Sequence, residues 1–280
     1  MSKLPSSPEI AGLFALATPF DAANCDWPRW SMPKLNGVRA MWVPGVGMFS
    51  RDGIPYETGV LPHIEAACEA AGQWLDGELY AHGMLLQDIN SRASIMRGVN
   101  NPHPDVKALR FHVFDLPQLA KGAEDRYNTL CTMRLQGRLD PGAIEVVEHR
   151  DGSCWAKART AFTSFVALGY EGAVYKHHGG YVPGRGKMLL KYKAWSDEDY
   201  DVVELVQGQD GKFDHSLGAV ICRDVHGATF SVGSFAFNDD TRLKIWSEYQ
   251  TGLKPARVKV KFLGLTQDKK PYNTQVLAFL

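Results

Sequence analysis

The segment PKLNGVR places a lysine, Lys34, between a proline and a Leu-Asn-Gly turn, and Arg39 follows five residues later in an apolar strand. A lysine whose amine is held forward in a fixed pocket acts as a nucleophile once it loses its proton. Nearby positive charge favours this loss because it lowers the pKa of the amine. The pattern also suits an ordinary surface lysine at a strand end, and the rest of the chain has to decide between the two.

Two other segments place paired charges on strand faces. Residues i and i+2 of a strand point to the same side of a sheet. Asp76 and Glu78 therefore share a face in WLDGELY, and Lys191 and Lys193 share a face in LLKYKAW. Each pair alone is typical of a solvated strand face.

Two single residues complete the set. In RFHVFDLP, Phe114 lies on the strand face opposite Phe111 and Val113, and in YEGAVYK, Glu171 begins a strand directly after a helix. Phosphoryl-type transfer depends mainly on alignment and on stabilisation of charge. A site built from lysines, arginines and carboxylates, and poor in histidine, suits that chemistry.

Strands and helices that can position these residues are readable along the chain. Strands are expected within 38–50, 73–83, 108–117, 143–149, 170–177 and 187–195, and helices within 10–17, 61–72, 86–98 and 153–169. From about residue 196 the pattern changes to about five short strands with one helix near 238–252, which is typical of a small closed barrel of the OB type. We therefore expect two domains, residues 1–194 and 195–280.

Composition excludes several classes of protein. Lys+Arg and Asp+Glu both number 31, so the chain has a formal net charge of zero. This balance argues against attachment to nucleic acid or membrane through bulk charge, although a local basic groove remains compatible with it.

The five cysteines are widely spaced and form no CxxC or Cys/His cluster, so they indicate neither a disulfide framework nor a zinc site. The apolar run 10–17 is too short to span a membrane. Glu9 precedes this run and Lys3 is the one basic residue before it, which does not favour a secretory signal. We expect a cytoplasmic monomer of a bacterium or a phage-infected cell, neither exported nor membrane-bound.

The order of the short segments is more informative than any one of them. KLNGVR, SRDG, LDGEL, FHVFD, EGAVYK and LLKYK follow one another and precede the expected barrel. This order resembles that of the covalent nucleotidyltransferase superfamily, in particular the minimal ATP-dependent DNA ligases of phages and bacteria, over about residues 20–280. The resemblance implies an α+β fold: an adenylation domain of antiparallel sheets with helices, followed by an OB-fold β-barrel.

The resemblance also implies roles for individual residues. Lys34 would attack the α-phosphorus of ATP to form a lysyl-AMP intermediate, and AMP would pass to the 5′-phosphate of a nick in double-stranded DNA. Glu78 would hydrogen-bond the ribose, Phe114 would stack on adenine, and Lys191 and Lys193 would hold the α-phosphate.

Glu171 would bind the divalent cation, Mg²⁺ or Mn²⁺. Asp76 is either a second metal ligand or a structural carboxylate. Arg39 and Arg51 would contact AMP or the 5′-phosphate of the nick, since a guanidinium suits phosphate oxygens. The basic residues expected to contact backbone phosphates of DNA are Arg51, Arg92, Arg97, Arg185, Lys187, Arg257, Lys259 and Lys261.

Three positions depart from the family pattern. Asn36 stands where the family usually has aspartate, and Met32, two residues before the lysine, offers no conventional hydrogen-bond donor for reading adenine. The last motif, which orients pyrophosphate, is represented at most by Lys269 and Lys270.

Two alternatives remain open at this level. RNA ligases and mRNA-capping guanylyltransferases share the lysine motif, although LDGELYAHGMLLQDINSRASIMRG resembles the DNA enzymes more closely. From a different class, the chain could be an OB-fold nucleic-acid-binding protein with a catalytically weakened transferase domain, an interpretation that Asn36 favours.

Overall fold

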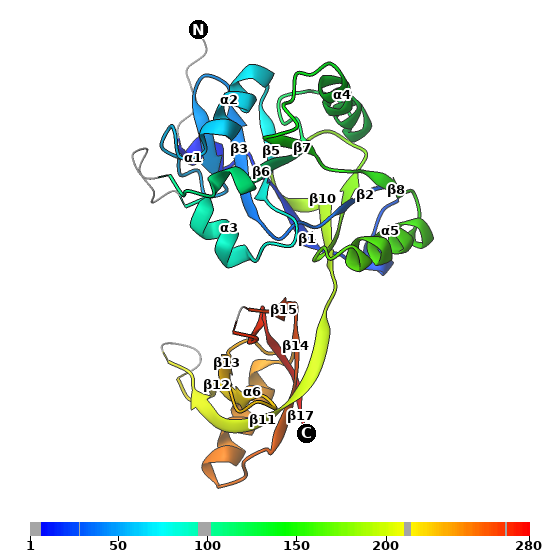
Figure 1. Ribbon diagram of the computed structural model, residues 1–280. Helices are drawn as coiled ribbons and strands as arrows, with labels where there is room; N and C mark the ends of the chain where they lie inside the picture. The colour runs from blue at the N-terminus through cyan, green and yellow to red at the C-terminus, as the bar shows by residue number, and fades with distance from the viewer. Residues whose placement is uncertain (1–6, 28, 95–101, 210–213, 267) are drawn as a thin grey trace. The chain divides into compact units, whose positions relative to one another are not determined.

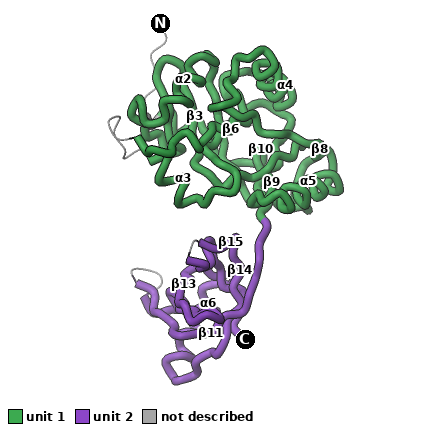
Figure 2. The backbone as a smooth tube through the Cα atoms, viewed as in Figure 1, with its two compact units in different colours: residues 1–193 green, residues 194–280 purple. Residues whose placement is uncertain are grey.

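The computed structural model describes residues 7–27, 29–94, 102–209, 214–266 and 268–280 (Figure 1). The chain divides into two compact units, residues 1–193 and 194–280 (Figure 2). The division lies one residue from the boundary that the change of strand pattern predicts, between β10 (Gly184–Lys193) and β11 (Ser196–Gln207).

Unit 1 contains two five-stranded sheets. The first has the order β1-β10-β9-β2-β8, with β1 (Ala15–Pro19), β2 (Arg29–Pro33), β8 (Arg150–Gly152) and β9 (Gly172–His177). The second has the order β4-β3-β5-β6-β7, with β3 (Val38–Val43), β4 (Gly47–Ser50), β5 (Leu75–Tyr80), β6 (Arg110–Asp115) and β7 (Ile144–Val146). The β1–β10 and β6–β7 pairs are parallel and the other pairs are antiparallel.

Helices pack against both sheets. The helical elements of unit 1 are α1 (Ser7–Ala11), η1 (Ala22–Asn24), α2 (Pro62–Ala71), α3 (Leu86–Arg92), η2 (Val106–Ala108), α4 (Ala123–Leu135) and α5 (Trp155–Ala167). α5 packs on β2, β8 and β9, whereas α4 packs on β6 and β7 (Figure 1). Gly72 ends α2 in the left-handed conformation with φ 62°, which is typical of a glycine C-cap.

The helix expected over residues 10–17 is wrong for most of its length. The helix ends at Ala11, before Gly12, and residues 15–19 form β1 instead. Glycine weakens a helix interior, and β1 gains parallel pairing with β10, from Ala15 opposite Gly184 onward. The end of the apolar run, residues 15–17, therefore belongs to β1, which is an edge strand of the first sheet.

Strand alternation places different residues on the two faces of the second sheet. On β3, Ala40 and Trp42 are buried in the main hydrophobic core of unit 1. Arg39, Asp76 and Glu78 lie at the alternate positions of β3 and β5, on the opposite face. The core thus fixes the two strands, and the strands fix the charged side chains relative to one another.

Unit 2 contains a five-stranded antiparallel sheet, in the order β13-β12-β11-β14-β17, and a second antiparallel sheet of two short strands. Its further elements are β12 (Leu217–Arg223), β13 (Thr229–Val232), α6 (Asp239–Gln250), β14 (Arg257–Phe262), β15 (Gly264–Leu265), β16 (Pro271–Tyr272) and β17 (Gln275–Phe279). Val202, Val220, Val258 and Val276 belong to its separate buried core.

The α+β class is confirmed, but the sheet of unit 2 is not a closed barrel within the described residues. The edge strands β13 and β17 do not pair with each other. The segment that follows β13 runs beside β17 instead, where the Ala236 amide donates to the Val276 carbonyl at 2.8 Å and the Val276 amide donates to Ser234 at 2.9 Å. Two backbone hydrogen bonds, and one from the Gln275 side-chain amide to the Phe235 carbonyl at 2.9 Å, therefore bridge the seam in place of a strand ladder.

No helix in the described part of the chain has the length and apolar character that a membrane crossing requires.

Candidate functional site

A pocket of about 580 Å³ opens in unit 1 and is lined by residues of both sheets. Lys34, Arg39, Glu78, Phe114, Lys191 and Lys193 all line it, as do Arg51 and Arg185. Residues that are far apart in the sequence are therefore brought together around one cavity. This juxtaposition is what the order of the motifs predicts.

The backbone around Lys34 is fixed by pairing that continues past the end of β2. Pro33, the last residue of β2, lies opposite Ala173 of β9. The Lys34 amide then donates to the Gly172 carbonyl at 2.9 Å, and the Glu171 amide donates to the Lys34 carbonyl at 3.2 Å. This two-way pairing fixes Lys34 next to Glu171, although the two residues are 137 positions apart.

Glycine is required at the neighbouring position, Gly172. Its φ is 148°, and a Cβ atom there would lie 2.1 Å from the carbonyl oxygen of Tyr192. Only a residue without a side chain allows β9 and β10 to approach this closely. The EG pair of the EGAVYK segment is thus explained by packing.

The side chains of Lys34 and Lys193 share the carboxylate of Glu171. Lys34 Nζ lies 2.5 Å from Oε2, and Lys193 Nζ lies 2.9 Å from Oε1. The Glu171 side chain is 6% exposed and does not line the pocket itself, whereas each lysine side chain is 20% exposed. The carboxylate therefore lies behind two amines that face the cavity.

Lys191 adds positive charge without an acidic partner of its own. Among the described residues, no carboxylate lies within ion-pair distance of Lys191 or Arg185. Partial burial lowers the pKa of Lys191, and the nearby Lys193 and Lys34 amines lower it further. Arg51 forms a weak contact with Asp52 at 3.6 Å and is 60% exposed at the edge of the pocket. This wall of the cavity is suited to an anion.

Arg39 is held by the carboxylate of Asp76. Its Nε and Nη2 atoms donate to the two oxygens of Asp76 at 2.8 and 2.7 Å. Tyr181 donates its hydroxyl to the same carboxylate at 2.7 Å. Asp76 is fully buried and does not line the pocket, so this geometry leaves its oxygens committed to the protein.

Glu78 is oriented by the loop that follows Lys34. Its Oε1 atom accepts a hydrogen bond from the Gly37 amide at 2.7 Å. A Cβ atom at Gly37 would lie 2.4 Å from the Leu79 carbonyl oxygen, so the glycine permits this approach. Burial raises the pKa of Glu78, while the Lys34 amine and the Gly37 amide oppose the increase.

Phe114 lies at a β-bulge. Asp76 pairs with Asp115 and the next residue, Gly77, pairs with Val113, so the register between β5 and β6 skips Phe114. A bulge inserts one residue without a cross-strand partner and redirects its side chain. The ring lines the pocket, and the Arg39 guanidinium lies 4.5 Å from its centroid.

The acidic residues fit a divalent cation only in part. Within the described residues, no group of three or more His, Cys, Asp or Glu side chains could enclose a metal ion. Mg²⁺ is commonly held by one or two carboxylates together with waters and substrate phosphates. Glu171, beside Lys34 at the pocket wall, would take that role by exchanging the Lys34 and Lys193 amines for the cation, whereas Asp76 is fully buried and its oxygens are held by Arg39 and Tyr181.

Two of the three basic residues expected in the stripe of unit 2 are paired with aspartates. Arg257, Lys259 and Lys261 of β14 lie opposite Asp201, Asp199 and Asp197 of β11. Lys259 pairs with Asp199 at 3.0 Å and Asp197 at 3.3 Å, and Arg257 with Asp201 at 3.9 Å.

The other basic residues expected to contact DNA are placed differently. Lys187 is exposed on β10. Arg92 contacts Asp88 at 4.0 Å and Asp105 at 3.8 Å, and Arg97 lies outside the described residues. Their contacts with DNA stay predictions.

Sequence reasoning missed part of the pocket wall. Leu16 and Ala17 of β1 and Leu86 and Asn90 of α3 line it. Since β1 was expected to be a helix, its contribution could not be found. Strand alternation could have predicted that Lys176 lies near the pocket, because it shares a face of β9 with Val174, which lines the pocket.

Comparisons with solved structures find the same architecture in ATP-dependent DNA ligases. A structure from a structure-function analysis of Lig E DNA ligases, described as binding DNA with a minimal scaffold, is 22% identical, with a TM-score of 0.75 over 95% of this chain and 98% of that chain. The Chlorella virus DNA ligase-adenylate is 20% identical, with a TM-score of 0.54 over 95% and 97%. The bacteriophage T7 ATP-dependent DNA ligase in complex with ATP is 13% identical, with a TM-score of 0.51 over 97% and 99%.

No protein-family model matches the chain, and no curated protein matches it. The similarity of the solved structures nevertheless shows that this chain has the fold of the minimal ATP-dependent DNA ligases, which is the fold that the motif order implies.

Proposed function

We propose that this protein is an ATP-dependent DNA ligase that seals nicks in double-stranded DNA. The observation that carries the proposal is the Lys34 amine, 2.5 Å from Glu171 and facing a pocket lined by further lysines and arginines. A lysine held in this way, in a chain with the fold of ATP-dependent DNA ligases, is suited to form a covalent nucleotide intermediate.

The first step would transfer AMP from ATP to Lys34. The Lys34 amine, after losing a proton, forms a bond to the α-phosphorus, and the bond from that phosphorus to the pyrophosphate oxygen breaks. An ammonium nitrogen cannot attack, so the proton has to leave before the new bond forms. Positive charge on Lys191 and Lys193 stabilises charge that develops on the phosphate oxygens.

A divalent cation bound at Glu171 would supply further neutralisation of the phosphates. Glu171 is the described carboxylate best placed to hold it, together with substrate oxygens. We assign Asp76 a structural role, because its oxygens accept hydrogen bonds from Arg39 and Tyr181. It thereby orients Arg39 toward the pocket.

The nucleoside would be held at the other side of the cavity. Glu78 would accept hydrogen bonds from the ribose hydroxyls, and Phe114 would stack on the adenine ring. Arg39 lies over the Phe114 ring and so is close enough to contact the bound AMP as well.

The second and third steps would act on DNA. The 5′-phosphate at a nick attacks the phosphorus of lysyl-AMP, which releases the Lys34 amine and gives an adenylated 5′-phosphate. The 3′-hydroxyl then attacks that 5′-phosphate, the new phosphodiester bond forms and AMP leaves. Arg51 and Arg185, which line the pocket, are the best-placed groups to bind the 5′-phosphate.

All five cysteines are free thiols. Free thiols are typical of proteins in a reducing compartment, and this supports work in the cytoplasm. We propose that the chain acts there as a monomer.

A nick-sealing assay tests the proposal and separates it from its alternatives. A duplex with one nick is incubated with the protein, ATP and Mg²⁺, and parallel reactions replace ATP by GTP or the DNA by nicked RNA. We expect sealing with ATP on DNA. Activity confined to RNA would indicate an RNA ligase, and nucleotide transfer confined to GTP would indicate a capping enzyme. DNA binding without any nucleotide transfer would indicate a nucleic-acid-binding protein with a catalytically weakened transferase domain.

A further inference from the structure

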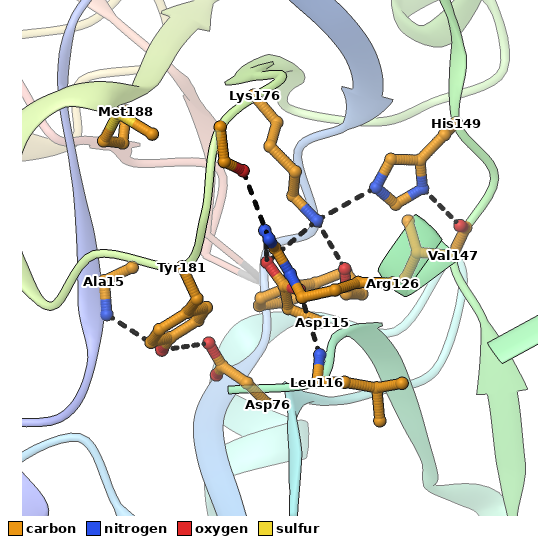
Figure 3. Close-up of polar contacts among 12 residues, drawn as sticks. Ala15, Asp76, Asp115, Leu116, Arg126, Val147, His149, Lys176, Tyr181 and Met188 are labelled. Atoms are coloured by element: carbon orange, nitrogen blue, oxygen red, sulfur yellow. Dashed lines mark hydrogen bonds and ion pairs between the residues drawn. The ribbon is translucent and has the colours of Figure 1, made fainter. Parts of the chain in front are cut away.

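A buried polar cluster lies beside the pocket but does not line it. Its centre is Lys176 of β9, which is 3% exposed (Figure 3). Lys176 Nζ lies 2.5 Å from the carbonyl oxygen of Phe114, 3.1 Å from Nε2 of His149 and 3.2 Å from Oδ2 of Asp115. An ammonium group has three N–H donors, and each of them has an acceptor here.

The two side-chain acceptors are themselves fixed. His149 Nδ1 lies 2.9 Å from the Val147 carbonyl, which can only accept, so Nδ1 carries the proton and Nε2 is free to accept from Lys176. Asp115 accepts from Nε and Nη2 of Arg126 at 2.6 and 3.2 Å (Figure 3). Lys176 is therefore held in one position by groups from β6, α4 and the segment after β7.

The third acceptor connects this cluster to the nucleotide pocket. Phe114 is the residue that the β5–β6 register skips. A bulge disrupts the local ladder, and the Lys176 amine binds the Phe114 carbonyl oxygen at this point. The backbone that carries the ring is therefore positioned by a buried lysine on a different strand.

Arg39 contacts the same residue from the pocket side. Its guanidinium lies 4.5 Å from the centroid of the Phe114 ring and pairs with Asp76. Asp76 lies opposite Asp115, the partner of Lys176, in the register of β5 and β6. The Arg39–Asp76 ion pair therefore contacts the ring of Phe114, and the amine of the neighbouring Lys176–Asp115 pair binds the Phe114 carbonyl oxygen.

A second buried cation, Arg29, provides a comparison for the role of Lys176. Arg29 of β2 is 1% exposed and donates to the Asp26 carbonyl at 2.9 Å, and its guanidinium also pairs with the Asp26 carboxylate. Arg29 is as buried as Lys176, and the described contacts of its guanidinium, with Asp26 and with the Met188 carbonyl, include no residue that lines the pocket.

We propose that Lys176 is a positioning residue for nucleotide binding: its hydrogen bond to the Phe114 carbonyl sets the plane of the ring against which adenine stacks. This inference rests on the proposed function, because it takes the pocket to bind ATP. Lys176 touches neither the nucleotide nor Lys34. Its effect on binding passes through Phe114.

The test is ATP binding measured by calorimetry in a Lys34→Ala background, which requires no chemistry. We expect Lys176→Met to raise the dissociation constant for ATP about tenfold, and Lys176→Arg to restore most of the affinity because it retains N–H donors. The matched control, Arg29→Met, removes an equally buried cation. It should lower the melting temperature without changing ATP affinity.

A double-mutant cycle distinguishes positioning from general destabilisation. In a Phe114→Ala background, Lys176→Met should change the dissociation constant less than twofold, because the ring through which it acts is missing. If Lys176→Met does not fold, Lys176→Leu, which likewise has no N–H donor, takes its place with the same expectations.

The inference is overturned if the Lys176 variant binds ATP within twofold of its parent, or if its full effect persists without Phe114. Nick sealing by the wild-type chain reports separately on the proposed function. Sealing with an unchanged ATP affinity in the Lys176 variant would reject the inference alone. A folded wild-type chain that neither seals nicks nor binds ATP would reject both.

Discussion

Two strands of the molecule carry basic residues at alternate positions, one in each unit. On β10 these are Lys191 and Lys193, and on β14 they are Arg257, Lys259 and Lys261. The two patterns are nearly identical as sequence. Their surroundings are different, and the difference lies in the neighbouring strand.

The strand next to β10 offers no carboxylate at the paired positions. Lys191 lies opposite Val174 and Lys193 lies opposite Gly172, and the nearest acid is Glu171, one residue before β9. The strand next to β14 has an aspartate opposite each basic residue. Lys191 keeps its positive charge available to a ligand and Lys193 shares Glu171 with Lys34, whereas Arg257 and Lys259 each have aspartate partners on the neighbouring strand.

The largest effect is expected when a lysine of β10 is removed. Lys193→Ala removes an amine from the pocket and should lower the rate of lysyl-AMP formation about 100-fold or more, as expected when a group that stabilises the transition state is lost. Lys259→Ala is the matched variant on β14 and should leave this rate within twofold. Single-turnover transfer from labelled ATP measures both. Equal effects would show that the two strands are functionally alike.

The next effect concerns the carboxylates that hold these lysines. Glu171→Gln should lower metal-dependent adenylation about 100-fold, since the variant loses both a partner of Lys34 and a metal ligand. Asp199→Asn, which removes the partner of Lys259, should not change it. The dependence of the rate on Mg²⁺ concentration is the measurement. A Glu171→Gln variant with the wild-type Mg²⁺ dependence would remove this residue from the metal site.

Acid should destabilise unit 1 selectively. Burial lowers the pKa of His149 to about 3, with the Lys176 amine adding to the effect. An unfolded histidine with a pKa near 6.5 binds more protons in this interval, so stability present above about pH 6.5 is lost as the pH falls toward 3. The slope for this group approaches about 1.4 kcal/mol per pH unit.

Unit 2 contains only His215 and His226, and neither is buried. Hydrogen exchange at pH 7 and pH 5 should therefore show lost protection mainly in unit 1, and His149→Gln should reduce the loss. A uniform loss across both units, unchanged in this variant, would contradict the assignment.

The smallest effect concerns the salt dependence of DNA binding. Each lysine or arginine that neutralises a phosphate contributes to the slope of log affinity against log salt. Arg185→Ala should reduce this slope by about one unit, whereas Lys259→Ala should reduce it less because aspartates already neutralise Lys259. Titrations of nicked duplex at several salt concentrations measure this. If Lys259→Ala reduced the slope more than Arg185→Ala, this would show that Lys259 exchanges its aspartate partners for a DNA phosphate.

Sequence reasoning predicted the faces of strands better than the partners of strands. Alternation placed Lys191 and Lys193 together, and the six segments indicated one pocket. Alternating acids at Asp197, Asp199 and Asp201 were also visible in the sequence. Their pairing with β14 was not, because it joins strands about 60 residues apart through the fold of unit 2.

Local irregularities were the hardest features to predict. The bulge at Phe114 depends on the register of β5 and β6, which no local pattern specifies. The role of Asp76 remained open for the same reason, since Tyr181 reaches it from a loop 105 residues away. The unclosed sheet of unit 2 likewise reflects tertiary pairing and has no local signature.

The central claim is that the Lys34 amine becomes covalently attached to AMP. The most direct measurement is incubation with α-labelled ATP and Mg²⁺ followed by peptide mapping. The account predicts acid-labile label on the peptide that contains Lys34, its absence in Lys34→Ala, and its release when nicked DNA with a 5′-phosphate is added. Label that persists in Lys34→Ala, or that maps to another residue, would contradict it.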